Sequence, residues 1–410
     1  MTFDIKIRSI IFLWLLSFSS SFYAQSSPQP GQNLWNLIAS IGINIDLLTQ
    51  CSPVPITASG TTISQPGTYC LTTDLSDGGN ITIAASNVYL DLSAHTISNV
   101  TNSAIKIASG MQHIIVNNGS INNCTHGVTT EIFANNIGMN NLNIFNTSTG
   151  IECKSTSTII LSDIQVTEFV DFAISLTDCT HATIQNSAVQ NINQTGTTPS
   201  YGYYIENTNT PIGSLIVTDC TATGNLRENS VGFYILNPLN DNRASIQIYG
   251  CQSSSFSHCF QFVAVNVPIV CKDCIASFAA SQTIDSMCYN IECSNSFFEN
   301  CIAAASFIGF GSANGSMTNC TLKNCSARSA NRGFDLATIG TRNVIQDCIA
   351  TGNFNVGFNI LQNSNNALFC FNSGIFNLVN NFSNMPGGLS SPITAISSGA
   401  RQYGDNLANI

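Results

Sequence analysis

The chain has 410 residues, of which only 8% are charged, with 12 Lys and Arg against 22 Asp and Glu. This charged share is about a third of the roughly 25% that is usual in soluble proteins, so Asn, Ser and Thr must supply most of the polar surface. Such a composition favours stacked β structure over long helices, whose polar faces normally carry Glu, Lys and Arg. The formal charge of −10 offers no basic surface to a nucleic-acid backbone, so no nucleic-acid partner is expected.

The N-terminal segment has the features of a secretory signal peptide. Lys6 and Arg8 precede a short apolar run, and small residues follow that run. The run is shorter than the about 18 apolar residues of a membrane-spanning helix, so no membrane segment is expected after signal removal. The signal is expected to cover residues 1–24, with cleavage after Ala24 or, alternatively, near Ser21. The mature protein is then expected to be secreted or to lie on the outer cell surface, with the periplasm as an alternative.

Residues 25–50 are expected to form a linker and an amphipathic cap helix. Apolar residues recur there at steps of three and four, at positions 34, 37 or 38, 41, 45 and 48. The polar face of this helix carries no Lys or Arg, so it is expected to cover the first coil of a stacked sheet rather than to bind a membrane.

A repeat of about 23 residues dominates the rest of the chain and places an Asn or Asp directly before a small or apolar residue. The polar position is filled in successive copies by Asn118, Asn141, Asp163, Asn186, Asp219, Gly250, Asp273, Asn300, Asn324 and Asp347. Short Asn and Asp side chains tolerate the left-handed backbone of a bend, and stacked amides can hydrogen-bond from copy to copy. This position therefore predicts a structural polar ladder at one corner of the fold.

A second register, in segments such as "YGYYIEN" and "VGFYILN", alternates apolar with polar or aromatic residues, as half-buried strands do. Each repeat then holds two or three short strands that bury their inner faces only by stacking on the next repeat. The sequence predicts an all-β protein, a right-handed parallel β-helix of about 11–12 coils. It is expected over residues 51–370, followed by a C-terminal cap or tail over 371–410.

The cysteines, 17 in all, raise the question of metal ligands, disulfides or core residues. Six of them follow the polar ladder and are expected to point inward, mostly as thiols: Cys220, Cys251, Cys274, Cys301, Cys325 and Cys348. No metal or other cofactor is expected, because the side chains of the C-x-x-C pair, Cys271 and Cys274, should leave opposite faces of a strand. Cys51 and Cys70 lie outside the ladder and are expected to form a disulfide that closes the first coil.

Both ends of the predicted β-helix carry a resemblance. The segments "ITASGTTISQPGTYCLTTDL", "ITIAASNVYLDLSAHTI" and "SSPITAISSGARQYGDNLANI" resemble secreted proteins of the pectin-lyase-like right-handed β-helix superfamily, in particular those abundant in chlamydia-like bacteria. Ala94 stands where these proteins usually have Gly. The resemblance implies the fold but little about activity, because the superfamily includes lyases, hydrolases, epimerases and passive surface proteins. Asp91 and His95 are expected to shape a bend, since neither has a second acid or base nearby in the sequence.

The outward positions of the alternating strands are where a ligand is expected to bind. One predicted row contains Thr129, Glu152, Ser175, Tyr204, Tyr234, Gln261, Asn290, Asp335 and Asn359, and the row beside it contains Glu131, Lys154, Thr177, Glu206 and Glu292. Tyrosines beside carboxylates and amides suit sugar rings, which stack on aromatic faces and hydrogen-bond at their edges. The candidate binding residues are Tyr204, Tyr234, Glu152, Lys154, Glu206 and Gln261. A polysaccharide, or a host or envelope surface, is the expected partner, and a merely solvated polar face is the alternative.

No catalytic residue is expected. Glu152 and Glu206 are predicted to lie two coils apart, near the upper limit of about 9.5 Å for the carboxyl pair of a glycosidase. Lys154 is predicted to be the only basic side chain on this face. The sequence therefore favours a non-catalytic glycan-binding, surface-binding or structural module, with a polysaccharide-active lyase, hydrolase or epimerase as the alternative, and it does not define the oligomeric state.

Overall fold

The computed structural model describes residues 53–76, 78–191, 199–210, 212–224, 230–239, 244–277, 286–312, 317–336, 342–360, 368–370, 372–375, 377, 380–383 and 394–396. The chain divides into two compact units, Met1–Ile45 and Asp46–Ile410, and all described residues belong to the second. The predicted signal segment, the cap helix and Cys51 lie outside the described residues. No helix of the described part is long and apolar enough to cross a membrane.

The described chain winds through three sheet faces, and each strand pairs in parallel with the strand one coil further on. Face A contains β2 (Thr62–Ile63), β4 (Ile81–Ile83), β7 (Ser103–Ile107), β13 (Tyr201–Glu206), β16 (Val231–Leu236), β19 (His258–Val265), β22 (Met287–Cys293), β25 (Ile308–Gly311), β28 (Arg332–Leu336), β31 (Val356–Ile360) and β34 (Asn380–Ser383). Face B contains β1 (Val54–Ile56), β3 (Gly67–Leu71), β5 (Val88–Asp91), β11 (His181–Gln185), β14 (Ser214–Thr218), β17 (Ser245–Tyr249), β20 (Ile269–Lys272), β23 (Phe297–Glu299), β26 (Thr321–Lys323), β29 (Val344–Gln346) and β32 (Leu368–Cys370).

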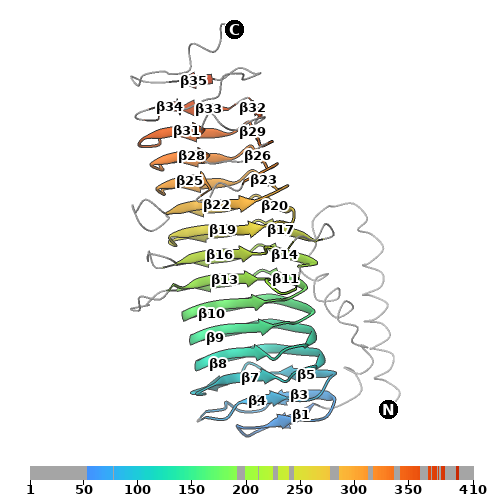
Figure 1. Ribbon diagram of the computed structural model, residues 1–410. Helices are drawn as coiled ribbons and strands as arrows, with labels where there is room; N and C mark the ends of the chain where they lie inside the picture. Colours follow the sequence, from blue (N-terminus) through green and yellow to red (C-terminus); the bar gives the residue numbers. More distant parts are fainter. Residues whose placement is uncertain are drawn as a thin grey trace, which may run out of the picture. The chain divides into compact units, whose positions relative to one another are not determined.

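Face C contains β6 (Thr96–Ser98), β12 (Ala188–Gln190), β15 (Thr221–Thr223), β18 (Gln252–Ser254), β21 (Ile275–Ser277), β24 (Ile302–Ala304), β27 (Ser326–Arg328), β30 (Ile349–Thr351), β33 (Ser373–Ile375) and β35 (Thr394–Ile396). Three long strands bend through all three faces: β8 (Gln112–Thr130), β9 (Asn135–Lys154) and β10 (Thr158–Thr177). Figure 1 shows the strands of faces A and B as two neighbouring stacks, one strand above the next.

Twelve successive coils have a strand on every face within the described residues, from β5, β6 and β7 to β32, β33 and β34. The predicted all-β parallel β-helix, with its predicted number of coils, is thus confirmed. Pairing continues through β33, β34 and β35, beyond residue 370, in the segment for which a cap or tail is expected.

The core inside face A is an aromatic stack with one ring from each of seven coils. Its members are Tyr203, Phe233, Phe260, Tyr289, Phe310, Phe334 and Phe358. Neighbouring ring centroids are 4.5 to 5.0 Å apart and the ring planes differ by at most 7°. This spacing matches the about 4.8 Å between paired strands, so the rings stack because the strands do. All seven are buried, and they supply a large share of the apolar area that each coil shields from water.

The polar ladder is confirmed in its backbone and in its contacts. All ten predicted positions have φ between 51° and 62°, the left-handed region that a bend requires. The amide of Asn141 donates to the side-chain oxygen of Asn118 at 3.0 Å, and that of Asn300 donates to Asp273 at 2.9 Å. The six cysteines that follow the ladder are fully buried, as predicted.

The prediction for Cys271 and Cys274 is wrong in one respect, because both side chains point into the core. The left-handed bend at Asp273 lies between them and turns Cys274 back toward the interior. No disulfide joins cysteines within the described residues, where the sulfur atoms of Cys271 and Cys301, for example, lie 3.8 Å apart. Cys70 is half-buried, and its predicted partner lies outside the described residues.

Asp91 shapes a bend in an early coil, as expected. Its carboxylate accepts a hydrogen bond from the backbone N–H of Ser93 at 2.6 Å, and both Ser93 and Ala94 have left-handed backbone angles. His95 does have an acidic neighbour in space, because its Nδ1 lies 3.2 Å from the carboxylate of Asp74 on the preceding coil. Asp74 is exposed and His95 is only partly buried, so this surface contact has small energetic weight.

Replacing Asn300 by valine is expected to lower the free energy of unfolding by about 1–3 kcal/mol. A left-handed backbone costs a β-branched residue about 1–2 kcal/mol, and the hydrogen bond to Asp273 is lost as well. Asn300→Gly removes the same hydrogen bond but keeps the backbone angle accessible, so it should cost less. Urea denaturation of both variants tests the ladder; equal stability of the valine and glycine variants would contradict this account.

Candidate functional site

The outward row predicted on face A is confirmed in register, and two of its members, Ser175 and Asn290, are buried. Backbone pairing joins Lys106, Thr129, Glu152, Ser175, Tyr204, Tyr234, Gln261 and Asn290 in that order, one per coil. Every predicted member from Thr129 to Asn290 therefore lies where the alternation of strand side chains places it. Lys106 extends this row by one coil, before the first coil that the sequence repeat includes.

A second outward row runs parallel to the first, three residues earlier on each strand. It joins Ser103, His126, Thr149, Phe172 and Tyr201. The offset is odd because two consecutive residues on each strand face the core, for example Gly127 with Val128 and Gly202 with Tyr203. The first of the two must be small: a Cβ at Gly127 would lie 2.4 Å from the carbonyl oxygen of Gly150 on the next coil.

Four aromatic rings from β10, β13 and β16 meet on the outward side of face A, and we call Phe172, Tyr201, Tyr204 and Tyr234 the tyrosine cluster. The rings of Tyr204 and Tyr234 are stacked, with centroids 5.1 Å apart and planes within 4° of each other. Tyr201 meets Tyr204 edge-on at 5.0 Å, and Phe172 stacks on Tyr201 at 5.4 Å. All four rings are partly exposed, so they form an aromatic platform at the surface.

The hydroxyl groups of this platform stay protonated. Tyr204 donates its hydroxyl hydrogen to the carboxylate of Glu206. Burial, together with this hydrogen bond, raises the pKa of Tyr204 well above its usual range. Burial and nearby groups, among them Tyr201 and the Glu206 carboxylate, raise the pKa of Tyr234 to about 12. The tyrosines are therefore neutral hydrogen-bond donors throughout the physiological pH range.

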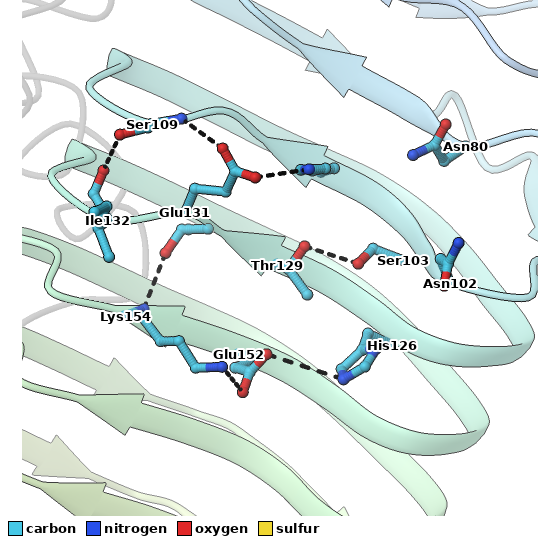
Figure 2. A pocket seen from close by; sticks show the side chains of 12 residues that line it. Asn80, Asn102, Ser103, Ser109, His126, Thr129, Glu131, Ile132, Glu152 and Lys154 are labelled. Carbon is cyan, nitrogen blue, oxygen red and sulfur yellow. Dashed lines mark hydrogen bonds and ion pairs between the residues drawn. The ribbon is translucent and has the colours of Figure 1, made fainter.

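A hollow of about 730 Å³ lies toward the N-terminal coils of the same face, over β7, β8 and β9. We call it the polar hollow, and Figure 2 shows the side chains around it. Its lining consists of Asn80, Asn102, Ser103, Lys106, Ser109, His126, Thr129, Thr130, Glu131, Ile132, Glu152 and Lys154. The outward row connects it to the tyrosine cluster, because Glu152 pairs with Ser175 and Ser175 pairs with Tyr204.

Two lysine–glutamate pairs organise the polar hollow. Lys106 Nζ lies 2.6 Å from Glu131 Oε1, and Lys154 Nζ lies 2.6 Å from Glu152 Oε1. Glu131 also accepts the backbone N–H of Ser109 at 3.1 Å. The hydrogen bond from Lys106 is the main cause that holds the pKa of Glu131 below its usual range. Glu131 is therefore a carboxylate and a hydrogen-bond acceptor at neutral pH.

The prediction that Lys154 is the only basic side chain on face A is wrong. Lys106 belongs to the same row, and His126 Nε2 lies 3.9 Å from Glu152 Oε2, so Glu152 sits between His126 and Lys154 (Figure 2). Lys106 was missed because β7 precedes the first copy of the polar ladder. His126 was missed because strict alternation from Thr129 directs it into the core. Aligning the segment "IKIAS" with "TTEIF" as neighbouring coils would have placed Lys106 in the row.

The other predicted site residues, Glu206 and Gln261, lie further along face A. Glu206 lies two coils beyond Glu152, as predicted, because Glu152 pairs with Ser175 and Glu206 pairs with Thr177 two positions along the same strand. Each of the two glutamates has its own partner, Lys154 for one and Tyr204 for the other. Gln261 continues the row beyond Tyr234 and is half-buried.

No group of three or more His, Cys, Asp or Glu side chains able to hold a metal ion occurs among the residues that the structure describes. Deeper along face A, Glu292 is buried and accepts a hydrogen bond from the amide of Asn290 at 3.3 Å.

Comparison with known proteins finds no matching family model and no matching curated protein. Among solved structures, the A-module of a mannuronan C-5 epimerase from Azotobacter vinelandii is similar, with 11% identity, a TM-score of 0.35, and coverage of 89% of this chain and 95% of that one. The catalytic domain of a GH87 α-1,3-glucanase, in complex with tetrasaccharides, has 12% identity and a TM-score of 0.29 over 84% and 64% of the two chains.

Tailspike protein 3 of bacteriophage CBA120 has 11% identity and a TM-score of 0.29, over 97% of this chain and 69% of its own. Identities and TM-scores this low carry no argument about ligand or activity. The strand pairing by itself establishes the architecture: this chain is a parallel β-helix, the fold that the resemblance to pectin-lyase-like proteins implies.

Proposed function

We propose that the protein is an exported or surface-located β-helix module that binds a polysaccharide along face A without cleaving it. The observation that carries this proposal is the continuity of the outward row, which leads from the polar hollow at Lys106 and Glu152 into the tyrosine cluster at Tyr204 and Tyr234. Hydrogen-bonding groups and stacking faces thus lie in one line on consecutive coils.

This arrangement suits an extended chain of sugars. Paired strands are about 4.8 Å apart, so the six steps from Lys106 to Gln261 span about 29 Å, enough for several sugar rings. The exposed faces of the tyrosine cluster can stack against the C–H faces of a sugar, while carboxylates, lysines and hydroxyls of the polar hollow meet its edges. Each contact is weak, and affinity grows when one chain engages several coils.

The protonation of the polar hollow supports binding rather than hydrolysis. A general acid needs a carboxyl group whose pKa is raised toward the working pH. The pKa of Glu131 moves in the opposite direction because Lys106 stabilises its charged form. Glu152 and Glu206 are each held by a partner of their own and lie two coils apart. The three glutamates are therefore suited to accept hydrogen bonds from sugar hydroxyls.

A polysaccharide-active enzyme is the second candidate, and the position of Glu152 favours it. The Glu152 carboxylate lies between the side chains of His126 and Lys154, so three groups able to transfer protons meet within one hollow (Figure 2). Screening the purified protein for release of reducing ends and of unsaturated sugars distinguishes the two functions. Turnover that is abolished in Glu152→Gln would replace the binding proposal with the enzymatic one. Silence in both the binding and turnover assays would leave a structural surface protein.

Replacing Tyr204 by alanine is expected to weaken glycan binding by about 2- to 12-fold, if a sugar ring stacked on the tyrosine contributes as much as an aromatic pair does, about 0.5–1.5 kcal/mol. The variant also removes the edge and face contacts of Tyr204 with Tyr201 and Tyr234. Binding is found on a glycan array and its Kd is then measured by calorimetry.

Two control variants isolate the ring. Tyr204→Phe keeps the stacking face and loses only the hydroxyl that donates to Glu206, so it should retain most of the affinity. Tyr249→Ala removes an outward tyrosine from β17 on face B and should leave binding unchanged. Equal affinity of Tyr204→Ala and the unmodified protein would rule out the tyrosine cluster as the binding platform.

A further inference from the structure

We propose that face A selects uncharged polysaccharides and rejects polyanionic ones such as uronates and sulfated glycans. The inference rests on the proposed function and specifies the class of glycan that the site takes. It follows from how charges are distributed over the polar hollow and the tyrosine cluster, which lie on one outward row.

The three basic side chains of the polar hollow, Lys106, Lys154 and His126, all lie against glutamates. Each of its two lysines is in direct contact with a glutamate, Lys106 with Glu131 and Lys154 with Glu152, both at 2.6 Å. A sugar carboxylate that took either lysine would leave that glutamate without its counter-charge. Sugar hydroxyls do not compete for the lysines in this way. They can donate hydrogen bonds to the carboxylates and accept them from the ammonium groups while both lysine–glutamate pairs remain in contact.

A carboxylate lies directly beside the neutral rings of the tyrosine cluster. Glu206 lies in direct contact with Tyr204. The strands that carry the cluster and its neighbour, β10, β13, β16 and β19, contain no Lys or Arg. Charge repulsion from Glu206, and from Glu292 further along the face, contributes to the raised pKa of Tyr234, so the field of these carboxylates reaches the stacked rings. The faces of aromatic rings are themselves electron-rich and favour C–H groups over anions.

The whole chain adds to this preference, with 22 Asp and Glu against 12 Lys and Arg. A polyanion approaching face A meets repulsion at long range and finds no unpaired cation on arrival among the lysines of the polar hollow. A neutral chain meets neither obstacle. The same logic predicts that binding of the neutral ligand depends little on salt, because no ion pair forms or breaks when it binds.

The test compares two sugar backbones in a neutral and an acidic form, and a third in a neutral and a cationic form. An array presents methyl-esterified and free oligogalacturonides, dextran and dextran sulfate, and N-acetylated and de-N-acetylated chitooligosaccharides. Neutral forms are expected to bind at least 10-fold more tightly than their acidic partners in 20 mM salt, and the difference should shrink in 500 mM salt. The Kd for the neutral form should change less than twofold over the same range.

Charge variants locate the cause. Glu206→Gln removes one negative charge beside Tyr204. It should reduce the ratio of the affinity for a neutral glycan to the affinity for its acidic form by 3-fold or more. Glu299→Gln makes the same change on face B, where Glu299 contacts Lys272 and Lys323, and should leave the ratio unchanged. Both variants are compared with the unmodified protein on the same array.

Three outcomes contradict the inference in distinguishable ways. Tighter binding of uronates or sulfated chains, with a Kd that rises steeply with salt, overturns the selectivity while the glycan-binding proposal stands. Preference for the de-N-acetylated, cationic chitooligosaccharide also overturns it, in favour of an amine-containing ligand. Silence of every backbone in every form overturns both this inference and the proposed function.

Discussion

Replacing Phe260 by alanine is expected to lower the free energy of unfolding by about 3–5 kcal/mol, the usual cost of truncating a buried phenylalanine. Phe260 is fully buried in the aromatic stack, 4.8 Å from the ring centroid of Phe233 and 5.0 Å from that of Tyr289. The variant leaves a cavity and breaks two stacked contacts at once. Because each coil is supported only by its neighbours, this damage is concentrated at the middle of the solenoid.

Chemical denaturation followed by circular dichroism measures this effect, with two matched variants. Phe260→Leu keeps most of the volume and should cost clearly less than alanine. Phe354→Ala truncates a phenylalanine that is 61% exposed and should change the unfolding free energy by no more than about 0.5 kcal/mol. A Phe260→Ala protein as stable as Phe354→Ala would show that the stack does not stabilise the fold.

Raising the pH above 9 is expected to destabilise the protein steeply. Burial raises the pKa of Cys179 to about 12, and raises the pKa of Cys153, Cys259 and Cys293 well above the ordinary thiol value of 9.0. Above pH 9 the unfolded chain releases these protons while the folded chain retains them. The unfolded state then binds fewer protons, so the free energy of unfolding falls as the pH rises. Each such thiol contributes about 1.4 kcal/mol per pH unit until its folded pKa is reached.

Denaturation midpoints measured between pH 7 and pH 11 test this dependence. The thiols should leave the free energy of unfolding unchanged below pH 8. Above pH 9 the free energy of unfolding should fall with a slope that corresponds to the release of several protons on unfolding. Cys179→Ala should reduce that slope by about one proton between pH 9 and 12. A protein whose stability does not decline up to pH 11 would contradict the thiol account.

The outward row could be predicted residue by residue because strand side chains alternate strictly once one register is anchored. The left-handed bends at Asn118, Asn141 and their successors provide that anchor. The prediction did not place Phe172, Tyr201 and His126 on the outward side, because strict alternation assigns them to the core. In the structure each precedes two consecutive core-facing residues, such as Gly202 and Tyr203, that shift the alternation by one.

Which side chains contact each other within the site also depends on distances between coils, and residue spacing in the sequence does not give these distances. Lys154 and Glu152 are two residues apart on one strand, and their contact could be guessed from the alternation alone. The contacts of Lys106 with Glu131 and of His126 with Glu152 join side chains on different coils, and each depends on the register between those coils. That register is set by the length of every intervening bend.

The sequence by itself determined the architecture of this protein. A repeated bend residue and a repeated apolar alternation are local properties, and short units made only of strands bury their apolar faces by stacking into a parallel β-helix. Only the tertiary structure decided which side chains meet on face A, because residues from seven coils become neighbours through pairing at long sequence separation. The physical reason is that the fold needs only an apolar interior and tolerant corners, whereas the site needs particular atoms within a few ångströms of each other.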